Sequence, residues 1–465
     1  MANKYLDLIE QTFRFPQEGF VLENDCLTFH GVPLKYLIEK YGTPLRLSYL
    51  PKIGQQIRKA RELFLHTMKG SGYGGKYYYC YCTKSNHFSY VLDEVLRHKA
   101  HLETSSEFDI DLILRLHKAG KISRDEIIIH NGFKPQGYIK KIAALLQRGF
   151  INAIPVLDNM EELQWLNQAV QDKCKLGIRI ATEEVPNFSV YTSRHGIRSS
   201  EVLPFYRQHI LSNKNFELTM LHFFVDTGIS DSLYYWGELK KAIRLYCELK
   251  KLSPSLHAFN IGGGMPIAYS LDFDFDYNYM VGEIIRLIAE ACQEAAVPEP
   301  DIFTEFGSYT VGESGAVLFS VLGQKKQNDS ELWYMIDNSL MNSIPDSWGI
   351  AQRFILLPVN KWQNEYTRVN IGGLSCDSFD FYNSEVHKNQ VYLPVFDPKD
   401  SEPLYIGFFH NGAYQDAISG YGGIKHCLIP APKQVLIRRD EEGRLVDALY
   451  RGEQEAEGML DILGY

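Results

Sequence analysis

The chain has 465 residues, of which 45% are hydrophobic and 23% are charged, so it can bury the cores of two or three domains. Its formal net charge of −9 argues against a nucleic-acid-binding protein, because such proteins carry a basic patch or stripe. The acidic balance instead suits the attraction of a small cationic molecule.

Neither the first residues nor the cysteines indicate a secreted, membrane or metal-binding protein. The segment MANKYLDLIEQTF includes acidic side chains and no apolar core of signal-peptide length. No apolar run approaches the roughly 20 residues that span a bilayer. The eight cysteines form no CxxC pair and no finger-like spacing, so we expect reduced thiols, no metal site and a cytoplasmic location.

The beginning of the chain contains two strand-like segments, VLENDCLTFHG and TPLRLSY, on either side of a predicted helix at Pro33–Tyr41. Short β-branched or aromatic segments then alternate with amphipathic helical patterns. The eight predicted strands are Tyr77–Thr83, Ala100–Thr104, Glu126–His130, Asn152–Leu157, Leu176–Ala181, Glu217–Val225, His257–Ile261 and Asp301–Glu305. Eight strand–helix repeats over roughly 250 residues predict an α/β fold, a (β/α)8 TIM barrel, with an open doubly wound sheet as the alternative.

From about Leu332 the helical periodicity fades, and turn-rich segments with β character dominate. The predicted strands of this tail are Arg368–Ile371, Gln390–Pro394, Pro403–Phe409 and Gln434–Arg438. We therefore expect residues 49–325 to form the barrel, and residues 1–48 and 326–465 to form a β-rich domain together.

Polar residues and glycines stand at or directly after the carboxyl ends of several predicted barrel strands, where TIM barrels carry their active sites. These residues are Lys84, Asn131, Asp158, Asp226, Thr227, Gly262, Gly263, Gly264 and Glu305. Lys84 follows YYYCYCT, and strand alternation puts it on the same face as Cys80 and Cys82. Partial desolvation there would lower the pKa of the amine and favour Schiff-base chemistry. The alternative is a solvated lysine at a strand end.

Gly262, Gly263 and Gly264 form a turn between a strand and a helical pattern, where backbone N–H groups can approach a phosphate. No Gly-Lys-Ser/Thr follows, so the turn is not a Walker loop. Glu305 could hold a pyridine nitrogen protonated. Capping a helix or pairing with a cation is the commoner use of a single glutamate.

The tail adds three candidates. Cys376 could donate a proton and Asp377 could bind a cationic group, or the pair could be a buried thiol beside a turn. Tyr414 lies in GFFHNGAYQDA, where an aromatic side chain could cover a planar ring, donate a hydrogen bond to phosphate or belong to the core.

In chain order, Y-x-x-K at Lys84, GGG at Gly262, E-x-G at Glu305, C-D-S at Cys376 and G-A-Y at Tyr414 resemble the fold-type III pyridoxal-phosphate decarboxylases. These alanine-racemase-like enzymes include ornithine, diaminopimelate and biosynthetic arginine decarboxylases. The resemblance runs from GTPLRLSY near residue 42 to beyond GAYQDA. It implies pyridoxal 5'-phosphate as cofactor, and at least a dimer, since the family's active site forms between subunits.

The resemblance also implies a role for each candidate. Lys84 would hold the cofactor covalently and Glu305 would contact its pyridine nitrogen. Gly262 to Gly264 would form the phosphate loop, and Tyr414 would be a further phosphate ligand. Cys376 would help to return a proton to the substrate.

The expected substrate is inferred from residues of the C-terminal part of the chain. Asp377 would grip the distal cation of a basic amino acid, with Cys376 and Asp377 facing the cofactor of a neighbouring chain. The segment SLMNSIPDSWGIAQRFILLPVN resembles biosynthetic arginine decarboxylases. The arginine that diaminopimelate decarboxylases usually carry after the position of Asp337 is missing. We therefore expect decarboxylation of L-arginine to agmatine in polyamine biosynthesis.

Three features depart from the family's pattern. H-x-G-S is replaced by Phe224-Val225-Asp226-Thr227, E-P-G-R by Glu305-Phe306-Gly307-Ser308, and the inserted helical domain of bacterial arginine decarboxylases is missing. Phe224 can still stack on the ring and Thr227 can still bind phosphate, but Asp226 has no role in the pattern.

The alternatives are a decarboxylase of diaminopimelate, ornithine, lysine or carboxynorspermidine, an inactive regulator that binds the cofactor, and an amino-acid racemase. The pair Cys376-Asp377 argues against the racemase, which needs a second base instead.

Overall fold

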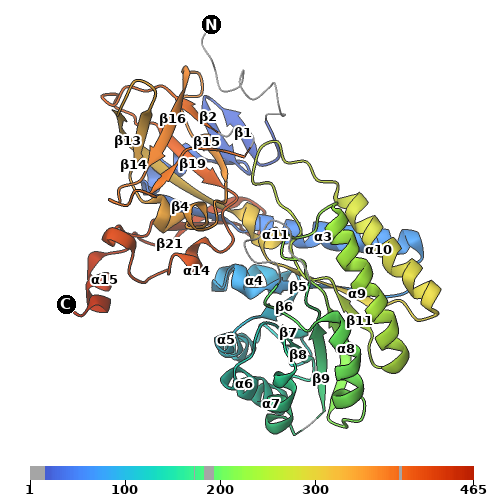
Figure 1. The fold of residues 1–465 in the computed structure, drawn as a ribbon. Coiled ribbons are helices and arrows are strands. Elements are labelled where there is room, and N and C mark those ends of the chain that lie inside the picture. Colours follow the sequence, from blue (N-terminus) through green and yellow to red (C-terminus); the bar gives the residue numbers. More distant parts are fainter. Residues whose placement is uncertain (1–15, 172, 183–192, 387–389) are drawn as a thin grey trace. The chain divides into compact units, whose positions relative to one another are not determined.

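The computed structural model describes residues 16–171, 173–182, 193–386 and 390–465, so the segment MANKYLDLIEQTF lies outside the described residues. The chain divides into two compact units (Figure 1). The barrel unit comprises Gly54–Pro266 and Phe275–Thr310, and the β-rich unit comprises the remaining segments, residues 1–53, 267–274 and 311–465.

Eight parallel strands form a closed barrel in the first unit. They are β5 (Tyr77–Cys82), β6 (His101–Thr104), β7 (Ile128–His130), β8 (Ala153–Leu157), β9 (Cys174–Arg179), β10 (Phe216–His222), β11 (Ala258–Asn260) and β12 (Asp301–Phe306). Each overlaps one of the eight predicted segments. The prediction of a TIM barrel is confirmed, and an open sheet is excluded because β12 pairs with β5 and closes the ring.

Helices lie outside the barrel strands, as Figure 1 shows for α5 to α8. The helices with residues in this unit are α3 (Pro51–Ser71), α4 (Ser89–Arg97), α5 (Glu107–Lys118), α6 (Gln136–Gln147), α7 (Glu161–Ala169), α8 (Ser199–Phe205), α9 (Leu233–Leu252), α10 (Tyr277–Ala295) and α11 (Ser308–Val311). Local sequence sets several of their starts. Ser106 and Asp109 form a capping box at α5, Ser232 caps α9 and Asp276 caps α10.

The inside of the barrel contains an apolar layer followed by a polar one. The apolar layer consists of Cys80, Ile129, Ile154, Val156, Met220, Ala258 and Phe303. Because side chains alternate along a strand, the residue two positions further on points inwards as well. Asn131, His222, Asn260 and Glu305 stand at these next positions, and all four are buried. We call them the polar layer; it lies at the carboxyl ends of the strands.

The β-rich unit is organised around β13 (Gly315–Lys326), which pairs with β4 (Leu45–Tyr49), β14 (Leu332–Ile336) and β19 (Tyr405–Phe409). Ala316 and Leu318 of this strand enter one core, whereas Val317 and Phe319 enter another. A strand buried on both faces is an unbroken apolar run, which periodicity alone does not separate from a helix. For this reason β13 was not predicted from the sequence.

The first and last parts of the chain share one sheet in this unit, because β4 pairs with both β13 and β20 (Lys433–Arg439). The remaining strands of the unit are β1 (Phe20–Glu23), β2 (Cys26–Phe29), β3 (Val32–Pro33), β15 (Ile355–Pro358), β16 (Tyr366–Gly372), β17 (Phe381–Tyr382), β18 (Val391–Pro394) and β21 (Leu445–Arg451), of which β1, β2 and β3 form a separate small sheet. The helices of the unit are α2 (Leu34–Tyr41), α12 (Leu340–Ser343), α13 (Asp346–Gly349), α14 (Gln415–Ile418) and α15 (Ala456–Leu463). The prediction of a β domain built from both parts of the chain is confirmed.

The boundaries of the two units differ from the predicted ranges 1–48, 49–325 and 326–465. Residues 49–53 and 311–325 belong to the β-rich unit instead of the barrel. Residues 311–325 belong there because β13, a strand of the β-rich unit, begins at Gly315. Residues 267–274 also join the β-rich unit, and Leu271 packs into its core.

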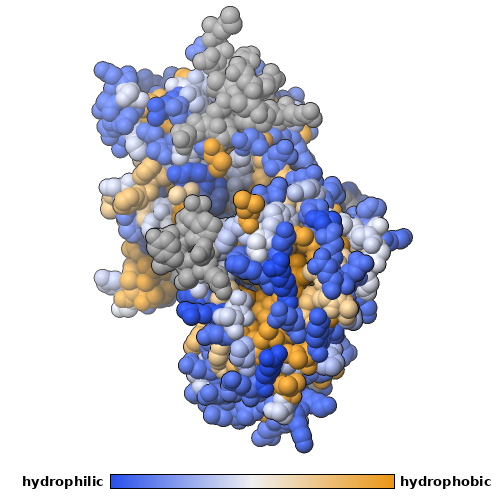
Figure 2. Space-filling view, turned by 45° about the vertical axis from the view of Figure 1, so that its right-hand side comes forward, coloured by the Kyte–Doolittle hydropathy of each residue, from blue (hydrophilic) through white to orange (hydrophobic). Residues whose placement is uncertain are grey.

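Most of the molecular face in Figure 2 is hydrophilic, with apolar residues gathered between the charged ones. Within the described ranges, no helix has the length and apolar character needed to cross a membrane. The eight cysteines are free thiols. In the same part of the chain, no three His, Cys, Asp or Glu side chains come together as metal ligands.

Candidate active site

Glu305 is the focus of the polar layer. Its buried carboxylate accepts hydrogen bonds from Asn131, with Nδ2 2.9 Å from Oε2, and from Asn260, with Nδ2 2.6 Å from Oε1. His222 Nε2 lies 3.3 Å from Oε2 in an ion-pair contact. These partners come from the ends of β7, β11 and β10, so several barrel strands converge on one carboxylate.

The surroundings of Glu305 keep it ionised. Burial alone would raise its pKa, but His222 and the two amide donors outweigh burial and lower the pKa to about 2. Glu305 is 5% exposed, so its charge acts in a region of low dielectric. Such a carboxylate is suited to binding a protonated nitrogen.

Asn260 connects Glu305 to the predicted glycine turn. Its Oδ1 accepts a hydrogen bond from Gly262 N over 2.9 Å, and Glu305 N donates to Gly262 O over 2.8 Å. Gly262 has a φ of +69°, which disfavours any L side chain. A Cβ on Gly263 would lie 2.5 Å from the carbonyl oxygen of Glu305. The turn therefore needs glycine because its backbone passes so close to the strand ends.

Phe224 lies against this turn and beside a buried arginine. A Cβ on Gly262 would lie 2.8 Å from Cδ2 of Phe224, and the guanidinium carbon of Arg179 is 5.4 Å from the centre of the ring. Arg179 is 9% exposed, and its Nε has no hydrogen-bond partner among the described residues. Burial lowers the pKa of Arg179, while the charges of Asp158 and Asp226 oppose this effect. Asp226 thus takes part in the charge balance of the site.

Lys84 lies in a 3-10 turn, Thr83–Ser85, directly after β5, and its side chain is exposed. Of the two alternatives for Lys84, the structure favours the solvated lysine at the strand end, because the turn begins before Lys84 and ends the strand alternation at Cys82. Cys82 is buried and donates its thiol to the carbonyl oxygen of Glu305 over 3.0 Å. Burial raises the pKa of Glu103 at the end of β6, and the charge of Lys84 partly offsets this. Lys84 therefore acts electrostatically on the carboxyl ends of the strands.

Of the candidates predicted from the sequence, the structure brings together Asn131, Phe224, Gly262–Gly264 and Glu305. Thr227 is exposed in the loop that follows Phe224. Nothing in the structure explains why serine replaces the arginine of the family pattern at Ser308, the first residue of α11.

Three further residues of the site, Arg179, His222 and Asn260, were missed; each is the last residue of its strand. For His222 and Asn260 a signal existed. Each polar side chain comes two positions after an inward-facing apolar residue, Met220 or Ala258.

Cys376, Asp377 and Tyr414 lie in the β-rich unit. Cys376 is exposed, with its Sγ 3.6 Å from that of Cys427, which excludes the alternative of a buried thiol. Asp377 Oδ2 lies 3.5 Å from Nε2 of His426. Tyr414 has a φ of +67°, which is uncommon for a residue with a side chain.

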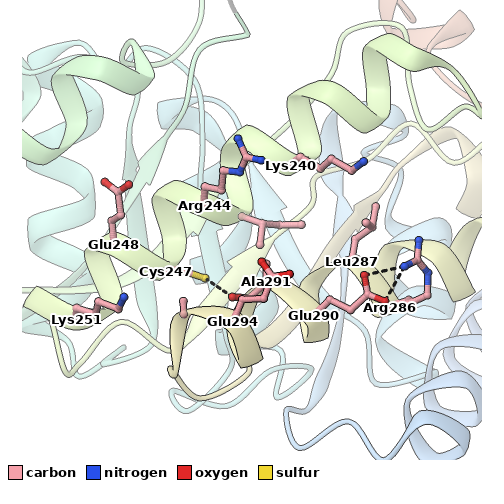
Figure 3. A pocket seen from close by; sticks show the side chains of 12 residues that line it. Lys240, Arg244, Cys247, Glu248, Lys251, Arg286, Leu287, Glu290, Ala291 and Glu294 are labelled. Carbon is pink, nitrogen blue, oxygen red and sulfur yellow. Dashed lines mark hydrogen bonds and ion pairs between the residues drawn. The ribbon is translucent and has the colours of Figure 1, made fainter.

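A groove on the barrel unit is separate from the polar layer. Its side chains, shown in Figure 3, come from α9 and α10 alone, and they include Arg244, Cys247 and Glu290. Because these helices lie outside the strands, the groove is not part of the candidate site.

Comparison with known proteins identifies the family. The model for the pyridoxal-binding domain of pyridoxal-dependent decarboxylases matches residues 54–312, which is more than half of the chain. The chain belongs to this family. It is therefore a carboxy-lyase whose cofactor is pyridoxal 5'-phosphate, as the sequence predicted, and the family is not that of the racemases.

Individual pyridoxal-dependent decarboxylases are similar to this one over most of its length. The biosynthetic arginine decarboxylase of Thermosynechococcus vestitus is 23% identical, over 91% of this chain and 82% of its own. The solved biosynthetic arginine decarboxylase of Campylobacter jejuni has a TM-score of 0.79 at 20% identity, over 97% of this chain and 89% of its own. The diaminopimelate decarboxylase of M. jannaschi has a TM-score of 0.74 at 17% identity, over 95% of this chain and 97% of its own. At these identities the solved structures show a common fold.

The residues of the decarboxylase barrel fit pyridoxal phosphate. The ionised Glu305 can bind a protonated pyridine nitrogen, and a glycine turn such as Gly262–Gly264 can present backbone N–H groups to a phosphate. Phe224 presents a half-buried ring. Arg179 Nε and Asn131 Oδ1 are buried polar atoms without a hydrogen-bond partner among the described residues, so a bound molecule can satisfy them.

Proposed function

We propose that the enzyme decarboxylates L-arginine to agmatine, a reaction of polyamine biosynthesis. The observation that carries decarboxylation is the buried, ionised Glu305 among three side-chain partners in a pyridoxal-binding barrel. Arginine is supported by the relatives, since the arginine decarboxylase of Thermosynechococcus vestitus matches 91% of the chain.

The barrel supplies the groups that act on the reacting atoms. Lys84 would hold the cofactor covalently through its amine. When bound, the cofactor would supply the electron sink that decarboxylation needs. Glu305 would keep the pyridine nitrogen protonated, because the carboxylate itself holds its proton far more weakly than usual. Phe224 would contact the ring of the cofactor.

Binding of the phosphate is assigned to Thr227, Gly262–Gly264 and Tyr414. Backbone N–H groups of a glycine turn and hydroxyl groups are neutral donors that phosphate accepts readily.

The β-rich unit supplies the groups for the substrate. The pKa of Cys376 is raised by its contact with Cys427 and by the charge of Asp377, so the thiol stays protonated and can return a proton to the α-carbon. Asp377 binds the guanidinium of the substrate. We assign both residues to the site of a neighbouring chain, which requires a dimer. The eight free thiols support a reducing, cytoplasmic location for the enzyme.

The test is release of carbon dioxide from arginine, ornithine, lysine, meso-diaminopimelate and carboxynorspermidine by the purified enzyme. Arginine should be turned over at least about tenfold faster than the others, a difference of about 1.4 kcal/mol. A preference for another amino acid would correct the substrate. If the protein bound pyridoxal phosphate but released no carbon dioxide from any of them, it would be a regulator.

Lys84→Ala tests the assignment of the lysine. The variant should lose the visible absorbance of lysine-bound pyridoxal phosphate, whereas Lys76→Ala should keep it. Lys76 is also an exposed lysine, just before the other end of β5. An unchanged spectrum in Lys84→Ala would overturn the assignment.

A further inference from the structure

Cys376 and Cys427 are two exposed thiols that the fold brings within 3.6 Å of each other, Sγ to Sγ. They are 51 positions apart in the sequence, so their contact depends on the folded β-rich unit. The assigned chemistry uses only Cys376. Cys427 is therefore a second thiol at the site with no part in decarboxylation.

Both thiol-bearing segments are anchored to α12. Buried Asp380 accepts hydrogen bonds from Leu340 N over 2.8 Å and from Ser375 N over 3.1 Å, which ties the segment of Cys376 to the helix. Asn342 does the same for the other segment. Its Oδ1 accepts from His426 N over 3.2 Å, and its Nδ2 donates to His426 O over 3.0 Å.

A third contact joins the segments directly, since Asp377 Oδ2 lies 3.5 Å from His426 Nε2. The residues beside the two cysteines are thus held, while the thiols themselves are exposed. Sulfurs in a disulfide are about 2.05 Å apart. Rotation of two exposed side chains can close the remaining gap without unfolding the anchored backbone.

We propose that Cys376 and Cys427 form a reversible disulfide that switches the enzyme off under oxidising conditions. The effect on activity rests on the role proposed for Cys376 as proton donor. The bond removes the proton from the Cys376 sulfur and fixes that sulfur away from any substrate, so decarboxylation stops until a thiol reductant restores the pair.

The oxidant is a peroxide, and the reaction balances with hydrogen peroxide. The pKa of Cys376 is raised, so Cys427 is assigned the first attack. Its thiolate attacks one oxygen of the peroxide, the O–O bond breaks, and hydroxide leaves to take up a proton. The Cys376 sulfur then attacks the resulting sulfenic acid, the S–O bond breaks, and a second water leaves with the Cys376 proton. Two thiols lose two electrons, and one peroxide becomes two waters.

The test compares the full-length enzyme before and after limited treatment with hydrogen peroxide. Peptide mapping by mass spectrometry under non-reducing conditions should find one cross-linked pair that contains Cys376 and Cys427. Activity should be lost in step with this cross-link and should return with dithiothreitol. In Cys427→Ser the cross-link should be absent, and inactivation should be roughly tenfold slower because the first nucleophile is missing. Cys26→Ser, which removes a partly exposed thiol elsewhere in the β-rich unit, should behave like the wild type.

Two results would overturn the inference. One is that both thiols remain free for alkylation after the treatment, and the other is that Cys427→Ser is inactivated at the wild-type rate. An enzyme with no decarboxylase activity would refute the proposed function instead, because peptide mapping detects the cross-link independently of activity.

Discussion

Asn260 and Glu305 are joined across the neighbouring strands β11 and β12 by a hydrogen bond of 2.6 Å. Asn260 also accepts a hydrogen bond from Gly262 N. The carboxylate and the glycine turn therefore share one side chain, so a change at Asn260 affects both the charge of Glu305 and the position of the turn.

Asn260→Asp separates these two effects. Aspartate can still accept the hydrogen bond from Gly262, but it donates none to Glu305 and adds a second negative charge beside it. The pKa of the carboxylate pair should rise, because two adjacent carboxylates resist ionising together. We expect kcat/KM near neutral pH to fall about 100-fold, which corresponds to about 2.7 kcal/mol, with the acidic limb of the pH–rate profile moved to higher pH.

The control is Asn152→Asp, which makes the same change at the opposite end of the barrel, just before the first residue of β8. This variant should keep the wild-type pH profile. An Asn260→Asp enzyme with an unmoved acidic limb would show that Asn260 does not govern the ionisation of Glu305.

Asp377→Ala tests the assigned grip on the substrate's cation. The lost contact lies at the far end of the substrate, so KM for a dibasic amino acid should rise about 100-fold, while the affinity for pyridoxal phosphate should change little. Steady-state kinetics and a cofactor titration measure these two quantities. Ser378→Ala, an exposed neighbour, is the matched control and should leave KM unchanged. Weaker cofactor binding with an unchanged KM would contradict the assignment.

The sequence predicted the barrel well because its strands have a regular pattern of short β-branched or aromatic runs between amphipathic helices. It predicted Glu305 because this residue ends such a run, and the glycine turn because it follows one directly. It left open whether Lys84 is desolvated or exposed, since a turn that begins at Thr83 leaves no trace in the alternation of YYYCYCT. Nor could it predict β13, whose two faces are both buried. Arg179 was missed for a different reason: an arginine at a strand end is ordinary in a sequence, and only burial beside Phe224 makes it notable.

The buried pair of Lys134 and Glu162 offers a test of what stabilises the loops after β7 and β8. Lys134 Nζ lies 2.9 Å from Glu162 Oε2, both side chains are fully buried, and Glu162 also accepts from Asp158 N over 3.2 Å. Lys134→Met leaves the glutamate buried without its cation, so the free energy of unfolding should fall by about 3–5 kcal/mol. Urea denaturation measures this loss.

Lys141→Met is the matched control for the buried pair. It removes a lysine whose contact with Asp111, also short at 2.7 Å, lies at the surface. Surface pairs contribute about 0–1 kcal/mol, so this variant should be nearly as stable as the wild type. An equal fall in the free energy of unfolding in the two variants would show that burial of the Lys134–Glu162 pair adds nothing to stability.

Asp337, directly after β14, makes the stability of the β-rich unit depend on pH. Burial raises its pKa to about 6, against hydrogen bonds that include one from Ser320 N over 3.1 Å. An aspartate in the unfolded chain titrates near 3.9. The folded state therefore binds the proton more tightly, and the contribution of Asp337 to stability falls as the pH rises between about 4 and about 6.

Asp337→Asn is neutral at every pH and can still accept from Ser320 N, so it should raise the free energy of unfolding by about 1–2 kcal/mol near pH 7.5 and by less near pH 5. Urea denaturation at the two pH values measures the difference, with Asp329→Asn in the exposed turn before β14 as the control. A gain that is equal at both pH values would mean that the proton on Asp337 is not its cause.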